Sequence, residues 1–405
     1  MAFVSAEYFR LTLHSYSNTD FIIEFPIIAR RTTVGEIGIG MIGYAFMGKA
    51  HTLGYRDVAA ISADDVPRPR LVSIYGRNAE QLELARDRLG WEKAVTDWQE
   101  IIDDPAITLV DNAGPNALHV EPTIAAMQAG KHVYCEKPLG PSAEDAFRMW
   151  DVARRTGVKH MCAFNYRFFP ALQLARQIIQ SGEIGEVYHY RSQFLVSSSL
   201  GERRQKGWRD DKQSAGSGAL GDLGAHHIDL SRFLLASDPS AVQASLKVRV
   251  SEAADGSKIE TDDQFGALMD YDNGALGIIE ASRVAGGHLV TSRVEIDGTK
   301  GSIAFSMQQL NELRVAGQDK AFKSIPVIRK DDPYQADWFP PGHPLGWVDT
   351  FSHEAKHILG AIAGLHDVDP IGATFKDGYY CSEIIDTAIR AAQLGQRQKI
   401  VYRQA

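Results

Sequence analysis

The sequence has few cysteines, with three in 405 residues: Cys135, Cys162 and Cys381. They lie far apart and show no metal-ligand spacing, so we expect neither a disulfide framework nor a zinc site. An odd number of isolated cysteines is typical of a reducing compartment. We therefore expect a cytoplasmic protein in which these side chains act as small buried apolar groups.

Long apolar runs and an excess of positive charge are also missing. No segment approaches the roughly 18 uninterrupted apolar residues that a membrane-spanning helix needs. The formal net charge is −8 at pH 7, with lysines and arginines scattered along the chain, which argues against nucleic acid as a partner. No internal repeat or low-complexity tract is present. These observations predict a soluble globular protein that binds neither membranes nor nucleic acid.

Residues 1–33 do not fit the pattern of the rest. Their most apolar stretch, residues 21–28, is interrupted by Glu24 and Pro26, and no basic start or small-residue cleavage site accompanies it. Arg30-Arg31 is not followed by the apolar segment of a twin-arginine export signal. We expect residues 1–33 to be a dispensable extension, or the result of a start codon placed too early.

From residue 34 onward, short apolar strands alternate with helical patterns. In the segment 79–89, for example, Leu82, Ala85 and Leu89 recur at helical spacing. Strands are predicted at residues 36–39, 71–75, 109–112, 132–135 and 159–164. Such alternation is typical of a doubly wound parallel sheet. We predict an α/β Rossmann domain that binds a dinucleotide over residues 34–165.

After Pro170 the pattern changes to longer strands with alternating apolar residues, as in residues 242–250. Asp272-Asn273-Gly274 and Asp297-Gly298 indicate hairpin turns. We predict an α+β domain for substrate binding and oligomerisation over residues 166–405, with a large, mostly antiparallel open sheet. Two helical patterns end the chain, and their packing back onto the first domain is left open. The proline- and aromatic-rich segment 331–347 is a candidate cover for the active site.

A glycine motif, Gly38-x-Gly40-x-x-Gly43, lies between the first strand and a helical pattern. In dinucleotide-binding folds the first glycine allows the turn, the second lets the pyrophosphate approach, and the third permits close packing. A tight turn without a ligand is the alternative. Cofactor contacts are assigned to Gly38, Gly40, Met41, Ile42, Gly43, Gly76, Arg77, Asn78, Pro115, Asn116, His119, Glu136 and Lys137.

The end of the second strand bears on the choice between NAD and NADP. An acidic residue there binds the ribose 2′-hydroxyl, whereas a small residue followed by arginine accommodates a 2′-phosphate. This chain has Gly76-Arg77-Asn78, which slightly favours NADP. Arg77 as a solvated surface charge keeps NAD open.

Asp222 and His226 are spaced i, i+4, so on a helix both side chains leave the same face. A histidine of ordinary pKa, about 6.5, is mostly neutral at pH 7 and can take a proton from a hydroxyl. In this hypothesis His226 is the general base, Lys137 polarises the substrate oxygen, and Asp222 orients it. His227 points elsewhere and is expected to be structural. A metal site of Asp222, His226, His227 and Asp229 would lack further ligands at zinc-like spacing, so no metal is expected.

These motifs together resemble the Gfo/Idh/MocA oxidoreductase family. The resemblance rests on the glycine motif, the Pro115-Asn116 loop, Glu136-Lys137-Pro138 and Asp222-x-x-x-His226, and it covers about residues 34–400. Further segments, Phe164-Asn165-Tyr166-Arg167, Trp208-Arg209 and residues 217–222, are similar to its levoglucosan dehydrogenase and inositol dehydrogenase-like branch. The resemblance implies that Lys137, Asp222 and His226 are the catalytic trio. It also implies a sugar, polyol or glycoside oxidised at a ring hydroxyl, often position 3.

Loops after strands or glycine-rich segments supply the candidate substrate contacts, which offer hydrogen bonds and flat ring faces to a sugar. They are Lys137, Asn165, Tyr166, Arg167, Trp208, Arg209, Asp222 and His226. Any of the loop residues could instead be a packing residue. Trp338, His343 and Trp347 are further candidates whose position the sequence does not fix.

Three functions remain open. An NAD(P)-dependent sugar or polyol dehydrogenase is favoured, while a glycosidase that uses bound NAD without net redox change would suit the same fold. A non-catalytic sugar-sensing regulator would not need the three catalytic residues together. An open antiparallel sheet needs a cover, and the resemblance implies a homodimer or homotetramer.

Overall fold

The computed structural model describes residues 8–14, 20–26, 35–62, 65–201, 205–318 and 320–404. Contacts divide the chain into two units, residues 1–35 and 36–405. In the first unit, β1 (Tyr8–His14) and β2 (Asp20–Pro26) pair antiparallel. These two strands are the part of the predicted extension, residues 1–33, that the structure describes. That the extension is dispensable stays a prediction.

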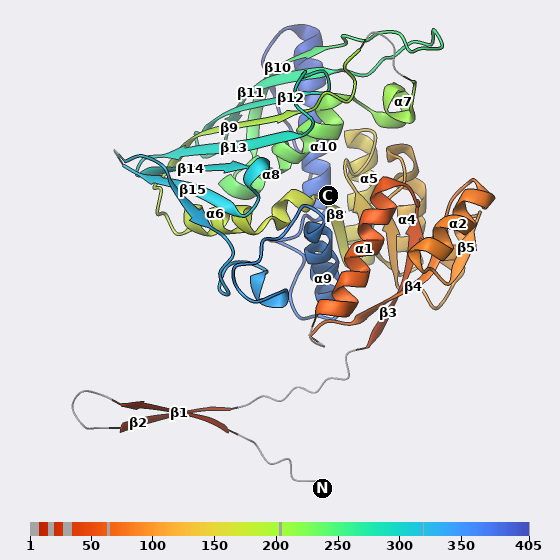
Figure 1. The fold of residues 1–405 in the computed structure, drawn as a ribbon. Coiled ribbons are helices and arrows are strands. Elements are labelled where there is room, and N and C mark those ends of the chain that lie inside the picture. The colour runs from red at the N-terminus through yellow and green to blue at the C-terminus, as the bar shows by residue number, and fades with distance from the viewer. Residues whose placement is uncertain are drawn as a thin grey trace. The chain divides into compact units, whose positions relative to one another are not determined.

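The second unit contains a six-stranded parallel sheet with the order β5-β4-β3-β6-β7-β8 (Figure 1). Counted along the chain from β3, this order is 3-2-1-4-5-6, the arrangement of a Rossmann fold. The predicted parallel α/β sheet is therefore confirmed. Its strands are β3 (Glu36–Ile42), β4 (Arg68–Tyr75), β5 (Lys93–Val95), β6 (Leu109–Asn112), β7 (His132–Glu136) and β8 (His160–Ala163).

Helices cover both faces of this sheet because its strands are apolar on both sides. In β3, Ile39 and Met41 face a core with α1 and the later helix α9, while Ile42 faces a core with α4 and α5. The helices are α1 (Phe46–Ile61), α2 (Ala79–Leu89), α3 (Gln99–Asp103), α4 (Val120–Gln128) and α5 (Ala143–Thr156). Short 3₁₀ turns at Asn116–Leu118 and Asn165–Phe168 follow β6 and β8.

The second sheet has nine strands in the order β16-β15-β14-β13-β9-β12-β11-β10-β17. All its neighbours pair antiparallel except β9 and β12, so the predicted mostly antiparallel sheet is confirmed. The strands are β9 (Val187–Leu195), β10 (Pro239–Lys247), β11 (Gln264–Tyr271), β12 (Leu276–Ser282), β13 (Thr291–Gly298), β14 (Gly301–Ser306), β15 (Glu312–Gly317), β16 (Lys323–Pro326) and β17 (Gln398–Lys399).

One of the two predicted hairpin turns is found at the expected residues, and the other is not. Asn273 and Gly274 connect β11 to β12 as expected, with Gly274 at φ +85°. Asp297 and Gly298 instead end β13, and the turn into β14 lies two residues later. The glycine there is required by packing, because a Cβ on Gly298 would lie 2.3 Å from the carbonyl oxygen of Ile184.

The remaining helices lie between these strands, and α6 connects β8 of the first sheet to β9 of the second. They are α6 (Pro170–Gln180), α7 (Lys212–Ala215), α8 (Ala225–Leu235), α9 (Asp349–Ile362) and α10 (Phe375–Leu394), with 3₁₀ turns at Trp208–Asp210, Met307–Gln309 and Gln335–Asp337. The helix α9 packs on α1, whereas α10 contacts α5 and β8 as well as α8 and β10. The last helix therefore joins the cores of both sheets.

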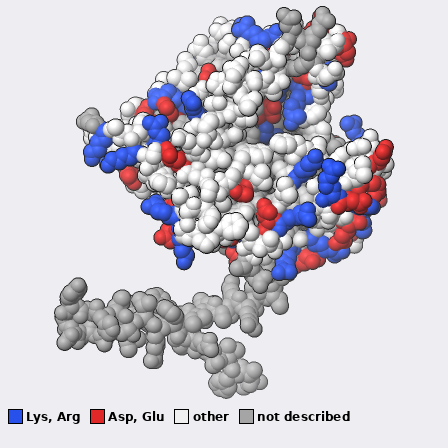
Figure 2. Space-filling view, viewed as in Figure 1, with Lys and Arg blue, Asp and Glu red and all other residues white. Residues whose placement is uncertain are grey.

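The surface of the described residues carries charge of both signs. On the face in Figure 2, Lys and Arg are interspersed with Asp and Glu, without an extended basic stripe. None of the described helices is both long enough and apolar enough to cross a membrane.

Candidate active site

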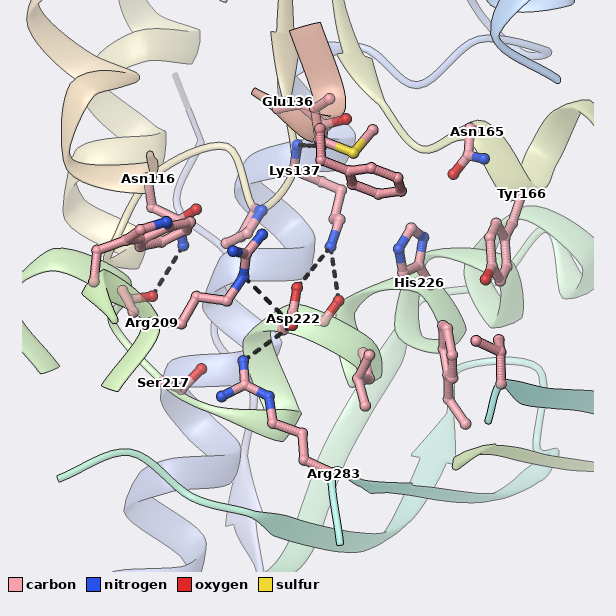
Figure 3. Close-up of a pocket in the computed structure, with 18 of the residues that line it drawn as sticks. Asn116, Glu136, Lys137, Asn165, Tyr166, Arg209, Ser217, Asp222, His226 and Arg283 are labelled. Atoms are coloured by element: carbon pink, nitrogen blue, oxygen red, sulfur yellow. Dashed lines mark hydrogen bonds and ion pairs between the residues drawn. The ribbon is translucent and has the colours of Figure 1, made fainter. Parts of the chain in front are cut away.

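A cavity of about 380 Å³ lies where loops from the two sheets meet (Figure 3). Lys137 follows β7 of the parallel sheet, and Asp222 and His226 precede or begin α8. Phe194 comes from β9 and Arg283 follows β12 in the second sheet. The cavity thus collects polar groups from both halves of the second unit.

The glycine turn lies five residues later than the sequence analysis placed it. Strand β3 continues to Ile42, so Gly38, Gly40, Met41 and Ile42 are interior strand residues rather than cofactor contacts. A Cβ on Gly38 would lie 1.8 Å from the carbonyl oxygen of Ala106. The predicted roles of these four residues are therefore corrected to packing within the sheet.

The turn itself is Gly43-Tyr44-Ala45, with Gly43 at φ +103°. A Cβ on Gly48, in the first turns of α1, would lie 2.3 Å from the Gly43 carbonyl oxygen. Gly43 and Gly48 are therefore the turn and packing glycines of the motif, and Ala45 occupies the middle position. The α1 N-terminus has no side-chain cap, and Phe46 and Met47 line the cavity. Its free N–H groups suit the pyrophosphate of a dinucleotide.

The loop after β6 is fixed by hydrogen bonds. His119 is buried, with Nδ1 3.0 Å from the Pro138 carbonyl oxygen and Nε2 2.9 Å from that of Gly114. Asn116 lines the cavity, donates to the Ala215 carbonyl at 3.0 Å, and follows Pro115, the residue before the 3₁₀ turn. His119 therefore supports the loop from behind instead of facing the cavity.

At the end of β4, the side chain of Tyr44 occupies the space beside Gly76. A Cβ on Gly76 would lie 2.1 Å from the Tyr44 ring. Arg77 is exposed, and Asn78 caps α2 by accepting a hydrogen bond from the Gln81 N–H at 3.1 Å. This edge thus presents one cation and no carboxylate from residues 76–78.

Lys137, Asp222 and His226 meet in the cavity, as Figure 3 shows. Lys137 Nζ donates to the Asp222 backbone carbonyl at 2.7 Å and lies 3.4 Å from Asp222 Oδ1. Asp222 lies on a π-helical turn, Leu220–Gly224, rather than on the regular helix that the i, i+4 spacing predicted. The N–H of Ala225 donates to the Leu220 carbonyl, and this wider turn leads directly into α8.

Three cations surround the Asp222 carboxylate. Besides Lys137, the Arg283 guanidinium lies 3.0 Å from Oδ2 and Arg209 Nε lies 3.6 Å from it. Burial alone would raise the pKa of Asp222, but Lys137, Arg283 and Arg209 together hold that pKa well below its usual range. Asp222 is therefore a permanent anion that fixes the Lys137 ammonium group.

His226 stacks on Tyr166, with ring centroids 4.3 Å apart. Burial, followed by the nearby charge of Lys137, keeps the pKa of His226 well below its usual value. Its Nδ1 atom is buried and has no hydrogen-bond partner among the described residues. The side chain is therefore a neutral imidazole that can accept a proton.

A buried network lies behind Lys137. His51 Nδ1 is 2.9 Å from Asp111 Oδ1, and Nε2 is 3.2 Å from Glu136 Oε1. The other carboxylate oxygen of Glu136 accepts the Lys137 backbone N–H at 2.9 Å. Burial would lower the pKa of His51, but Asp111 and Glu136 outweigh it and raise that pKa to about 10. Glu136 therefore binds the charged His51 with one oxygen and the Lys137 backbone N–H with the other.

The candidate substrate residues divide into two groups. Asn165, Tyr166, Trp208 and Arg209 line the cavity together with Lys137, Asp222 and His226. Arg167 does not, because it is buried and donates to both oxygens of Asp229, at 2.8 and 2.6 Å. The expected substrate contact of Arg167 is therefore corrected to an internal ion pair.

The sequence analysis missed several cavity residues. Arg283 follows a strand of the second sheet and had no motif to identify it. Phe46 was also missed. It lines the cavity and stacks at 5.8 Å on Trp347, which the sequence analysis had named as a further candidate and which lines the cavity too. Phe46 is the first residue of α1, directly after the turn Gly43-Tyr44-Ala45, so placing the turn correctly would have identified it. Trp347 comes from the 331–347 segment, whereas Trp338 donates to His353 and lies outside the cavity lining.

The other two residues of the alternative metal site face different partners. His227 Nε2 lies 3.1 Å from Ser292 Oγ, and Asp229 pairs with Arg167. Among the described residues, no group of three or more His, Cys, Asp or Glu side chains is arranged to hold a metal ion.

Comparison with known families agrees with this arrangement. Residues 37–164 match the oxidoreductase family with an NAD-binding Rossmann fold, and residues 172–304 match the GFO/IDH/MocA C-terminal domain. Levoglucosan dehydrogenase of Pseudarthrobacter phenanthrenivorans is 37% identical over 383 residues, which cover 88% of this chain and 96% of that protein. The chain belongs to the Gfo/Idh/MocA oxidoreductase family. The resemblance inferred from the motifs is thereby confirmed.

Other proteins are similar to this chain over most of their length. Glucose-6-phosphate 3-dehydrogenase of Bacillus subtilis is 28% identical over 86% of this chain and 94% of its own. A levoglucosan dehydrogenase structure in complex with NADH and levoglucosan has 36% identity and a TM-score of 0.86, covering 90% of this chain and 99% of that one. An oxidoreductase domain protein from Kribbella flavida, also 36% identical, has a TM-score of 0.87 over 91% of this chain and 100% of its own.

Proposed function

We propose that this protein is an NAD-dependent dehydrogenase that oxidises a ring secondary hydroxyl of a sugar, polyol or glycoside. The convergence of Lys137, Asp222 and His226 in one cavity is the observation that carries this proposal. The family supports oxidoreductase chemistry, and a levoglucosan dehydrogenase of similar fold binds both NADH and a sugar.

Each of the three cavity residues has a separate role in the proposed reaction. When bound, NAD supplies the acceptor for the hydride that leaves the carbinol carbon. His226 takes the hydroxyl proton, since its buried imidazole is neutral. The Lys137 ammonium donates to the same substrate oxygen and stabilises the negative charge that develops there. Asp222, held by Arg283, keeps Lys137 aimed at that oxygen, and the product is a ketone.

The cradle formed by Gly43, Gly48 and the α1 N-terminus would hold the pyrophosphate. We propose NAD as the preferred cofactor because the solved levoglucosan dehydrogenase complexes contain NADH. The earlier preference for NADP, based on Gly76 and Arg77, finds no support in these comparisons. Arg77 nonetheless lies two residues after the end of β4, where the adenosine ribose of a dinucleotide would bind. Its contribution to NADP affinity can be tested.

The experiment is cofactor reduction followed at 340 nm with monosaccharides, inositols, anhydrosugars and glycosides, each with NAD and NADP. Accumulation of reduced cofactor supports a dehydrogenase. Release of aglycone without a change at 340 nm would instead identify a redox-neutral glycosidase. Silence in both assays, with cofactor and sugar binding measured by calorimetry, would favour a sugar-sensing regulator.

We also propose that two copies associate through the open face of the nine-stranded sheet. That face exposes Leu268, Leu276 and Ile278 on the adjacent strands β11 and β12, and an open sheet of this size gains from a cover. Sedimentation velocity should show a dimer or tetramer. A Leu276→Glu and Ile278→Lys double variant should shift it toward monomer, and an unchanged assembly would exclude this face.

A further inference from the structure

An exposed apolar rim lies beside the cavity and is not used by the catalytic residues. Val290 lines the cavity while the residue remains 42% exposed, and the preceding Leu289 is 88% exposed. Leu200, on a neighbouring loop, is 60% exposed. Single exposed leucines are common on protein surfaces, but here two lie on loops that lead to Val290 in the cavity lining, which suggests a ligand contact.

The fold explains why these residues are neighbours. β9 and β12 are the parallel pair of the second sheet, so the loops at their carboxyl ends leave the same edge. The Ser199 N–H donates to the Arg283 carbonyl and the Ala285 N–H to the Val196 carbonyl, both at 2.9 Å. A Cβ on Gly286 would lie 3.5 Å from the Leu200 side chain. The two loops therefore run side by side.

The same loops connect the rim to the reaction centre. Arg283, which binds Asp222, begins one loop, and Phe194, near the end of β9, lines the cavity. The Gln308 side chain donates to the Val290 carbonyl at 2.5 Å. Gln308 belongs to the 3₁₀ turn Met307–Gln309, and Met307 lines the cavity. This bond therefore connects the rim to the cavity wall. A group extending from a sugar held at Lys137 toward Val290 would meet apolar side chains.

The chemistry of the rim defines its ligand. Residues 196–201 and 286–290 contain no Asp, Glu, Lys or Arg. The polar His288 in this range lies 2.9 Å from Thr291 Oγ1 through its Nδ1, while the exposed Leu200, Leu289 and Val290 suit an aromatic or alkyl group. Resting on the proposed function, we infer that the substrate is a glycoside whose apolar aglycone lies on the rim formed by Leu200, Leu289 and Val290.

The test compares methyl and phenyl glycosides of D-glucose, D-galactose and D-xylose, in both anomeric forms. We expect kcat/KM to be at least about three-fold higher for the phenyl member of the preferred pair, as expected for a half-exposed apolar contact. Leu289→Gln should lower this phenyl-to-methyl ratio toward one. Leu84→Gln, an exposed leucine on α2, is the matched control and should leave the ratio unchanged.

Calorimetric binding of the same pairs, in the presence of NADH, separates this inference from the proposed function. Tighter binding of phenyl glycosides without cofactor reduction would retain the rim and reject the dehydrogenase. Oxidation with equal kcat/KM for both members would reject the rim and retain the dehydrogenase. If Leu289→Gln instead changes the sedimentation coefficient with the ratio unchanged, the rim contacts a second copy of the chain and the inference is wrong.

Discussion

His51 joins Asp111 to Glu136, and Glu136 in turn accepts the backbone N–H of the neighbouring Lys137. The Lys137 main chain, in the loop after β7, is thus held by Glu136, whose partner is the buried cation His51 of helix α1. Since α1 also begins at the glycine turn, the same helix contributes to the cofactor cradle and to the support of Lys137.

Replacing His51 by Gln should destabilise the protein, because it leaves two buried carboxylates without their cation. A loss of about 3–5 kcal/mol is expected for a broken buried pair. The folded-state pKa of His51 is raised to about 10, so its contribution is complete below about pH 6.5 and is lost as the pH rises toward 10. Urea unfolding of wild type and variant at pH 6, 8 and 10 should show a shrinking difference. A constant difference would contradict a charged His51.

His226→Ala should reduce kcat by at least about 100-fold with little change in NADH affinity, since a general base contributes about 10²–10⁴ in rate. Because burial lowers the pKa of His226, the acidic limb of kcat/KM for oxidation should lie below pH 6.5. His343→Ala, on an exposed loop, is the control. An acidic limb above pH 7 would exclude a neutral buried His226 as the base.

Arg283→Met should lower kcat/KM about ten-fold, which corresponds to about 1.4 kcal/mol. The Asp222 carboxylate would keep Lys137 and Arg209 but lose its 3.0 Å partner. Arg283→Lys should recover part of the activity. Arg154→Met, on the exposed side of α5, serves as the matched control, and equal effects of the two Met variants would remove Arg283 from the site.

Gly48→Ala should weaken NADH binding and destabilise the fold by about 1–3 kcal/mol, because its Cβ would press on the Gly43 carbonyl. Gly266→Ala is the control, since no atom lies within 4 Å of a Cβ there. Thermal unfolding and NADH titration of both variants test the shifted turn. Normal NADH affinity in Gly48→Ala would contradict it.

Arg77→Ala tests the cofactor preference. An exposed arginine that binds a 2′-phosphate should contribute to NADP affinity and not to that of NAD. We expect kcat/KM with NADP to fall about ten-fold and that with NAD to stay within about two-fold. Equal changes with both cofactors would show that Arg77 does not contact this end of the dinucleotide.

The sequence predicted those features that depend on local pattern. Alternating apolar segments predicted both sheets. The spacing of Asp222 and His226 predicted that they share a face, and the hypothesis that Lys137 meets them agrees with the cavity. The glycine motif was misplaced because Gly38 and Gly40 reproduce the expected spacing while serving strand packing. Arg283 was missed because it reaches Asp222 through sheet pairing, and Arg167 was misassigned because its partner Asp229 lies 62 residues away. Such long-range pairs leave no local signal.

The packing of α10 has a consequence for synthesis of the chain. This helix covers α5 and β8 in the first half and α8 and β10 in the second. It begins at Phe375, long after α5 ends at Thr156. At about 5–20 residues per second, a ribosome needs roughly 10 to 45 s to span this interval. During that time the apolar side chains of α5 and β8 that α10 later covers remain exposed to solvent.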